Sequence, residues 1–106
     1  MIQGDVYNYT FKAPDKRRPC VILTRSILIP DFNAITIAPI TTTIRNTDSQ
    51  VSLDETDGMR EECVVNLASI QTVQKDKLGS LITHLSPERM HEIKQAIEFT
   101  FGFKFL

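Results

Sequence analysis

Two apolar runs rich in β-branched residues constrain the fold of this chain more than any other feature of its sequence. They are residues 20–23 (Cys-Val-Ile-Leu) and 34–40 (Ala-Ile-Thr-Ile-Ala-Pro-Ile). Short runs of this kind are typical of buried β-strands. Arg17 and Arg18 precede the first run, and three threonines at 41–43 follow the second. Guanidinium groups and hydroxyls held at strand ends form a candidate anion site, and strand propensity alone is the competing explanation for the threonines.

The chain has the length and composition of one globular domain. Its 106 residues are 42% hydrophobic and 24% charged, which suffices for a core without disulfides or a structural metal. Its apolar runs are shorter than the roughly 18 residues of a membrane span. Its first residues have neither the basic nor the apolar segment of a secretion signal. We therefore expect a single domain over residues 1–106 that works in the cytoplasm.

The distribution of charge and the number of cysteines and histidines indicate which kinds of site this chain can hold. The formal net charge is −1, but residues 1–47 hold six basic and three acidic residues, whereas residues 48–62 hold six acidic and one basic. This asymmetry fits a phosphate-binding face and fits plain solvated loops equally well. Cys20 and Cys63 lie in apolar runs and are expected to be buried free thiols. With two His and no ligand pair at zinc spacing, the sequence predicts no metal and no other cofactor.

The spacing of apolar residues predicts five to seven short strands in a small, strongly curved, barrel-like sheet. The candidate strands are residues 5–11, 20–24, 34–42, 50–53, 63–67, 70–73 and 81–84. Pro19 fits the first residue of the second strand, and Pro39 implies an edge or a bulge in the third. The connections are expected at 12–17 (turning at 13–15), 25–33, 45–49, 54–61 (turning at Asp57-Gly58) and 68–69, with one helical turn at 75–78.

A helix is expected at the C-terminal end. Ser86, Pro87 and Glu88 have the pattern of an N-cap, a first helical residue and a first-turn acid. Apolar residues recur at helical spacing at Met90, Ile93, Ile97 and Phe101, and Gly102 follows them. The expected fold class is therefore mainly β with a C-terminal helix (α+β). The tail at 103–106 is unusually apolar, so we expect it to pack on the core or to form an interface.

Short motifs along nearly the whole chain occur in the order found in one known family. They are Gly4-Asp5-Val6-Tyr7, Arg18-Pro19, Ala38-Pro39-Ile40-Thr41, Val51-x-Leu53, Asp57-Gly58, Val64-Val65-Asn66-Leu67, Gln71-Thr72-Val73, Leu78-Gly79 and Leu85-Ser86-Pro87-Glu88-Arg89-Met90. With these motifs the sequence closely resembles the MazF/PemK family of toxin endoribonucleases from type II toxin–antitoxin systems. The resemblance implies a compact SH3-like, CcdB-like curved barrel, a homodimer, and metal-independent cleavage of single-stranded RNA. It also implies a cognate antitoxin, whose disordered tail lies across the RNA groove.

The resemblance also implies the catalytic residues. In the family they are the Arg of the Arg-Pro pair and the Thr that ends the next long strand, which here are Arg18 and Thr41. This sequence departs from the family pattern at two places. The loop at 12–17 is shorter than usual, and Ala68 stands where many members have an acid. Which group acts as the general acid or base is therefore left open.

RNA cleavage without a metal uses the 2′-OH of the substrate as the nucleophile on the adjacent phosphate. The protein must accept that proton, supply one to the 5′-oxygen and stabilise charge on the phosphoryl oxygens. Arg18 suits the last task because a guanidinium can contact two oxygens, although its pKa above about 12 makes it a poor base. Thr41 can offer a hydroxyl to the phosphate or orient the 2′-OH. The competing explanation for Arg18 is a surface ion pair with Asp15 or Glu61.

Further side chains are expected to bind the RNA backbone. They are Arg17, Lys16, Lys12, Thr42, Thr43 and Arg45, with Arg25 as a further candidate. Tyr9 or Phe11 could stack on bases, with core packing as the competing explanation. His84 and His91 match no catalytic position of the family and are expected to be structural.

Two other functions remain open at this point. A toxin of the same barrel fold could poison gyrase, or a catalytically degenerate member could bind antitoxin or RNA without cutting. The Arg-Pro pair and Ile40-Thr41 favour the nuclease, because a gyrase poison needs no phosphate site. The absence of an acid at Ala68 keeps the degenerate member open.

Overall fold

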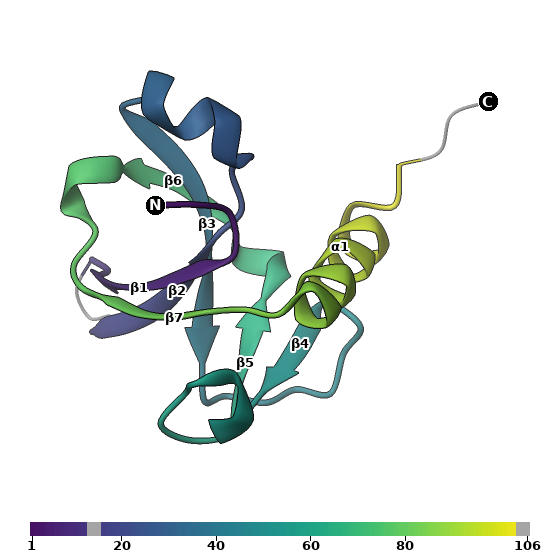
Figure 1. Ribbon diagram of the computed structural model, residues 1–106. Coiled ribbons are helices and arrows are strands. Elements are labelled where there is room, and N and C mark those ends of the chain that lie inside the picture. The colour runs from purple at the N-terminus through teal and green to yellow at the C-terminus, as the bar shows by residue number, and fades with distance from the viewer. Residues whose placement is uncertain (13–15, 104–106) are drawn as a thin grey trace.

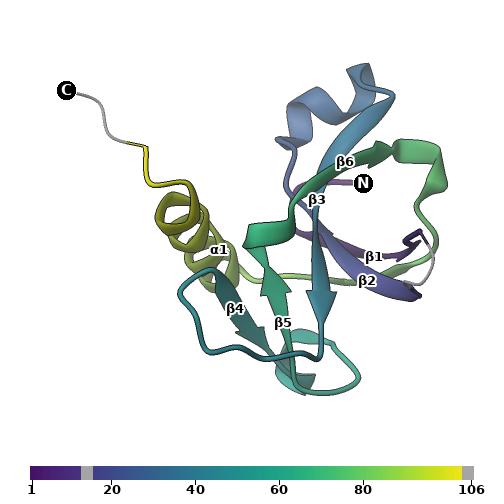
Figure 2. The ribbon, with the colours of Figure 1, turned by 180° about the vertical axis from the view of Figure 1, so that it is seen from behind.

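The computed structural model, which describes residues 1–12 and 16–103, is a curled antiparallel sheet flanked by one helix (Figures 1 and 2). The strands are β1 (Asp5–Thr10), β2 (Arg17–Ile22), β3 (Ala34–Thr41), β4 (Gln50–Leu53), β5 (Cys63–Asn66), β6 (Gln71–Gln74) and β7 (Leu81–His84), and the helix is α1 (Pro87–Phe101). Four short 3₁₀ helices connect them: η1 (Ser26–Asp31), η2 (Glu55–Asp57), η3 (Leu67–Ser69) and η4 (Lys75–Lys77). The strand order is β4-β5-β3-β2-β1-β7, and β6 also pairs with β3. The expected mainly-β fold with a curved sheet and a C-terminal helix is confirmed.

The second strand is the one whose expected bounds are wrong by more than one residue. β2 begins at Arg17 instead of Cys20, so Pro19 is its third residue and not its first. Pro19 lies opposite Asn8 on β1, and the Asn8 N–H donates away from β2, to the Ser80 carbonyl at 3.0 Å. The missing backbone donor of Pro19 therefore breaks no bond to β1, and the strand can extend through it.

The connection after β2 is more regular than expected, because residues 26–31 form η1. Ile29 of η1 is buried, and its carbonyl accepts a hydrogen bond from Lys75 Nζ at 2.8 Å. The expected turn at residues 13–15 lies outside the described residues.

The central strand β3 changes partners at Pro39. On one side, residues 37–39 pair with β2, and the last pair is Cys20 with Pro39. On the other side, residues 34–37 pair with β6 and residues 40–41 pair with β5. The three residues of η3 lie between β5 and β6 and accommodate the offset between the two ladders. Because proline has no backbone N–H, Pro39 fits a position where one ladder ends and another begins.

The curled sheet has a hydrophobic core on each face. The larger core contains α1 residues and comprises Val6, Val21, Ala38, Ile40, Val51, Leu53, Met59, Cys63, Val65, Leu67, Leu85, Ile93 and Ala96. The second comprises Phe11, Cys20, Ile22, Ile29, Ile35, Ile37 and Val73. Alternate residues of β3 divide between the two, since side chains in a strand alternate between faces. The side chains of Pro39 and Thr41 therefore project from the same face of β3 as those of Ile35 and Ile37, beyond the end of the second core.

Helix α1 begins and ends as expected. The Ser86 hydroxyl accepts from the Arg89 N–H at 3.2 Å, and Gly102 closes the helix with a φ of 58°. One member of the expected apolar stripe is misplaced, because Phe101 is 44% exposed and stacks on Phe103 with ring centroids 6.2 Å apart. Residues 104–106 of the apolar tail lie outside the described residues. No helix within the described ranges is long and apolar enough to cross a membrane.

Both cysteines are buried and free, as expected. Burial raises the pKa of the Cys20 thiol to about 12. Burial and the neighbouring acidic residues, Glu61 first among them, raise the pKa of the Cys63 thiol to about 11. Thiolates are the reactive form, so the burial and the raised pKa values disfavour reaction at both cysteines.

Candidate active site

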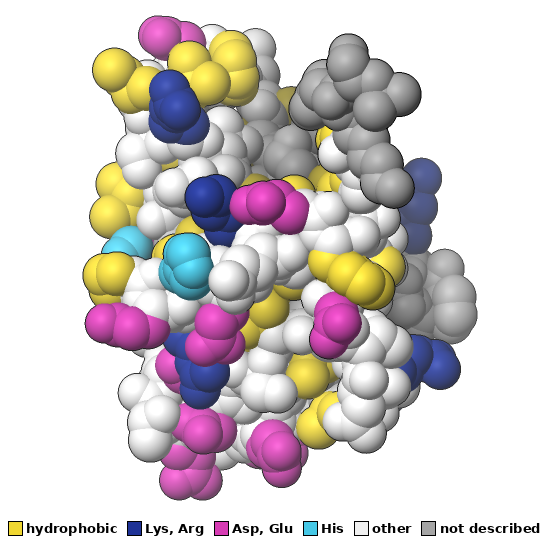
Figure 3. Space-filling view, turned by 90° about the vertical axis from the view of Figure 1, so that its right-hand side faces the viewer, with side chains coloured by type: hydrophobic (Ala, Val, Ile, Leu, Met, Phe, Trp, Pro, Cys, Tyr) yellow, Lys and Arg dark blue, Asp and Glu magenta, His cyan; other side chains and the backbone are white. Residues whose placement is uncertain are grey.

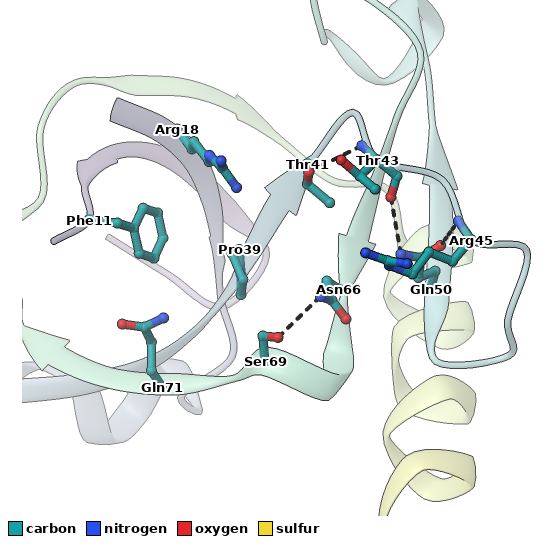
Figure 4. A pocket seen from close by; sticks show the side chains of 10 residues that line it. All are labelled: Phe11, Arg18, Pro39, Thr41, Thr43, Arg45, Gln50, Asn66, Ser69 and Gln71. Atoms are coloured by element: carbon teal, nitrogen blue, oxygen red, sulfur yellow. Dashed lines mark hydrogen bonds between the residues drawn. The ribbon is translucent and has the colours of Figure 1, made fainter. Parts of the chain in front are cut away.

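A cavity of about 270 Å³ lies where the paired strands β2 and β3 part. Its lining combines polar side chains from five strands and two connections with two apolar ones (Figure 4). The lining residues are Phe11, Arg18, Pro39, Thr41, Thr43, Arg45, Gln50, Asn66, Ser69 and Gln71.

Arg18 and Thr41 reach this cavity from matching positions on neighbouring strands. The β2–β3 ladder ends at the pair Cys20–Pro39, and two residues further along each strand lie Arg18 and Thr41. Side chains two residues apart share a face, so both project from the face of Pro39. Beyond this pair β2 continues against β1, whereas β3 pairs with β5. The cavity therefore opens between two strands whose register places Arg18 opposite Thr41.

The Thr41 hydroxyl is oriented by the backbone that follows it. The Thr43 N–H donates to Thr41 Oγ1 at 3.1 Å (Figure 4). Because the oxygen accepts this bond, the hydroxyl hydrogen of Thr41 remains available to donate to a bound group.

Gln50 holds the loop that brings Thr43 and Arg45 to the cavity. Its Oε1 accepts from the Arg45 N–H at 2.8 Å, and its Nε2 donates to the Thr43 carbonyl at 3.3 Å. The chain turns directly afterwards at Asn46, which has a φ of 54°, a conformation that asparagine tolerates better than most residues. Figure 4 shows the Arg45 guanidinium turned back beside Gln50. One carboxamide therefore fixes the position of a second cation at the cavity.

The opposite wall comes from β5, η3 and β6. Asn66 Oδ1 accepts from the Ala68 N–H at 3.1 Å, and Asn66 Nδ2 donates to Ser69 Oγ at 3.1 Å. Asn66 thus caps η3 and places the Ser69 hydroxyl at the rim. Gln71, the first residue of β6, projects from this wall toward Phe11 (Figure 4).

The cavity is a cationic site. Of its ten lining residues two are arginines, and none is Asp, Glu, His or Cys. Figure 3 shows acidic side chains gathered at the lower end of the face that it displays. No group of three or more His, Cys, Asp or Glu residues in the described part of the chain is arranged to hold a metal ion. The arrangement suits a phosphate, with guanidinium and hydroxyl groups as its donors.

The structure brings together some of the predicted site residues and separates others. Those that line the cavity are Arg18, Thr41, Thr43 and Arg45. Those that are exposed but do not line it are Arg17, Lys16, Lys12, Thr42 and Arg25. Arg17 directly precedes Arg18 in β2, so it projects from the opposite face. Asp15, one of the two alternative ion-pair partners expected for Arg18, lies outside the described residues.

The structure also shows where the two candidate stacking residues and the two histidines lie. Phe11 lines the cavity, and Tyr9 packs edge-on against it with ring centroids 4.8 Å apart. Phe11 is only 8% exposed, so it serves mainly as core. His84 Nδ1 lies 2.9 Å from Asp5 Oδ1, away from the cavity lining, and His91 is exposed on α1.

Five lining residues received no role from the sequence: Pro39, Gln50, Asn66, Ser69 and Gln71. Asn66 and Gln71 lie in motifs that carry the family resemblance, which was the available signal for them. Gln50, the first residue of β4, and Ser69, in η3, lie outside those motifs and gave no such signal.

Comparisons with known proteins agree on one family. The family model described as PemK-like, MazF-like toxin of type II toxin-antitoxin system matches residues 2–101. Endoribonuclease MazF3 of Mycobacterium tuberculosis is 36% identical over 83 residues, which cover 78% of this chain and 81% of the relative. Probable endoribonuclease MazF2 of the same species is 31% identical over 91 residues, which cover 85% and 89%.

Solved structures agree with these relatives. Mycobacterium tuberculosis toxin MazF-mt6 superposes with a TM-score of 0.87 at 31% identity, covering 95% of this chain and 99% of that one. An endoribonuclease in complex with its cognate antitoxin, from a mycobacterial species, shares the fold with a TM-score of 0.86 at 23% identity, covering 100% and 99%. The chain therefore belongs to the PemK-like and MazF-like toxin endoribonucleases of type II toxin–antitoxin systems.

Proposed function

We propose that this toxin cleaves single-stranded RNA in the cavity between β2 and β3, by attack of a 2′-OH on the adjacent phosphate and without a metal ion. The observation that carries the proposal is the opposed register of Arg18 and Thr41 at the point where the two strands part. The relatives MazF3 and MazF2 are named as endoribonucleases, which supports RNA as the substrate.

In the proposed step the 2′-oxygen forms a bond to phosphorus as the bond to the 5′-oxygen breaks, leaving a cyclic phosphate and a 5′-hydroxyl. Arg18 contacts two phosphoryl oxygens and stabilises the charge that develops on them. Thr41 donates its hydroxyl hydrogen to the same phosphate. Arg45 binds a neighbouring phosphate. The lining residues include no His or carboxylate, so we assign the proton transfers to water that enters the open cavity.

The composition of the lining supports a metal-independent step. Mg²⁺ is held in proteins by oxygen ligands, and carboxylates are the usual ones. The lining residues that the structure describes supply hydroxyls, carboxamides and guanidinium groups instead. Two guanidinium groups would repel a divalent cation and attract the phosphate directly.

We further propose two protein partners. A cognate antitoxin covers the cationic cavity, as a mycobacterial endoribonuclease of this fold was solved in complex with its own antitoxin. A second copy of the chain covers apolar surface near the end of α1, where Phe99 is 60% exposed and Phe103 79% exposed. Large exposed aromatics grouped in this way are typical of interfaces. With RNA as its substrate, the toxin would act in the cytoplasm.

The test is cleavage of single-stranded RNA in excess EDTA, beside a gyrase supercoiling assay. We expect cleavage products with cyclic phosphate ends, no requirement for Mg²⁺ or Mn²⁺, and normal supercoiling. Inhibited supercoiling with intact RNA would identify the gyrase poison instead. Intact RNA with normal supercoiling would identify a degenerate member.

A further inference from the structure

We infer that Gln71 is a specificity-determining residue, whose carboxamide reads the edge of one nucleobase beside the phosphate held by Arg18 and Thr41. The inference rests on the function proposed for this cavity. It adds the side chain that selects where the RNA is cut.

The position of Gln71 sets it beside the proposed phosphate site. Gln71 on β6 lies opposite Ile37 on β3, and Pro39 and Thr41 follow Ile37 on the same face of β3. Figure 4 shows the Gln71 carboxamide directed across the cavity toward Phe11, on the side of Pro39 away from Thr41. A nucleotide whose phosphate lies between β2 and β3 would therefore present a neighbouring base to Gln71.

Gln71 differs from the other two carboxamides of the cavity in having its hydrogen-bonding groups available. The Asn66 carboxamide is used by the Ala68 N–H and Ser69 Oγ. The Gln50 carboxamide is used by the loop backbone. Gln71 is exposed, and its side chain makes no hydrogen bond to any residue in the ranges 1–12 and 16–103. Its oxygen and its amide hydrogens can therefore both bind a ligand.

The chemistry of a carboxamide suits base reading. It places an acceptor and a donor side by side, which matches the paired groups on a base edge. In single-stranded RNA these edges are open to the protein. Arginines that bind phosphates carry no sequence information, so Arg18 and Arg45 cannot select a site by themselves. Pro39, which is half-buried in the cavity wall, adds an apolar surface against which the face of the base can lie.

The test compares cleavage-site preferences on an RNA library of random sequence. The variants are Gln71→Ala, Gln71→Glu and the matched control Gln74→Ala, which removes the same side chain from the opposite face of β6. We expect Gln71→Ala to weaken the preference at one position near the cut by about tenfold, the range of one two-point base contact. Gln71→Glu can only accept, so preference at that position should shift away from uracil and toward adenine, cytosine or guanine, which present amino groups. Gln74→Ala should leave the preference unchanged.

The saturating single-turnover rate at each variant's preferred site separates selection from chemistry. We expect this rate to stay within about threefold of wild type, since Gln71 makes no proposed contact to the phosphate. Unchanged preferences in both Gln71 variants would overturn the inference and leave the proposed cleavage standing. Loss of cutting at every site by a folded Gln71→Ala would also overturn it, because the side chain would then serve the chemistry. Absence of cutting by the wild-type protein would instead refute the function on which the inference rests.

Discussion

Arg89 on α1 and Asp57 in η2 form an ion pair, in which Arg89 Nε donates to Asp57 Oδ1 at 3.0 Å. Asp57 Oδ2 accepts from the Asp54 N–H at 2.9 Å, and Arg89 also contacts the Glu92 carboxylate. The bond to Asp57 raises the pKa of Arg89 further, so the guanidinium stays charged. The Asp57 side chain is 8% exposed and that of Arg89 is 24% exposed. This pair therefore fastens the acidic segment at η2 to the helix.

Replacing Arg89 by Met should destabilise the fold, because Asp57 would keep a largely buried charge without its partner. We expect a loss of about 1–3 kcal/mol in the free energy of unfolding, measured by urea denaturation with circular dichroism. Lys94→Met is the matched control, since Lys94 and Glu98 form an exposed pair at 3.8 Å and should contribute less than about 0.5 kcal/mol. Equal effects of the two substitutions would contradict the assignment.

Arg18→Ala should lower the single-turnover cleavage rate at saturating RNA by at least about 10²–10³, the usual effect of removing one preorganised electrostatic donor. Arg18→Lys should remain badly impaired, because one ammonium group cannot reproduce a two-point contact. Arg17→Ala is the control: it removes the neighbouring charge from the other face, and should mainly weaken RNA binding. If Arg17→Ala abolished turnover while Arg18→Ala cut normally, the register of the site would be wrong.

Thr41→Ala should reduce the same rate by less than Arg18→Ala, and Thr41→Ser should recover much of it, because the proposed contact to the phosphate is made by the hydroxyl. Thr42→Ala is the matched control, since Thr42 is exposed and outside the cavity lining. The comparison is made at saturating RNA with a circular dichroism spectrum for each variant. A Thr41→Ser variant as slow as Thr41→Ala would rule out this role for the hydroxyl.

Gln50→Ala should weaken RNA binding indirectly, by releasing the loop that positions Arg45. Loss of the carboxamide frees the loop that holds Arg45, so RNA should bind more weakly, with a shallower dependence on salt concentration. The double variant Gln50→Ala/Arg45→Ala should bind no more weakly than Arg45→Ala alone, since both changes remove one interaction. Additive losses in RNA affinity across a salt titration would show that Gln50 acts independently.

The two cysteines should resist a thiol reagent in the native state. Their burial and raised pKa values, about 12 for Cys20 and about 11 for Cys63, leave almost no thiolate at pH 8. We expect both to react fully in guanidinium chloride and neither to react within minutes in buffer, as measured by the release of a coloured thiolate. Rapid native labelling of either cysteine would indicate local opening of the core.

The sequence predicted the strands well and the site only in part. Six of the seven strands begin and end within one residue of the expected bounds, since alternation and turn residues mark them locally. The start of β2 could not be predicted from the polar residues Arg17 and Arg18, because pairing with β1 makes them a strand. Arg18 and Thr41 came from family motifs. Gln50 and Ser69 reach the cavity through side-chain bonds to loop backbone and to Asn66, which no periodicity encodes.

The change in strand pairing of β3 at Pro39 bears on how toxins of this family can evolve new RNA preferences. The cavity borders three ladders that have β3 in common, and the β2–β3 register alone places Arg18 opposite Thr41. Insertions or substitutions in η3, or in the loop that Gln50 holds, would reshape the far wall without shifting that register. If this cavity cuts RNA as proposed, related toxins can therefore change the RNA sequence that they recognise while Arg18 and Thr41 keep their positions.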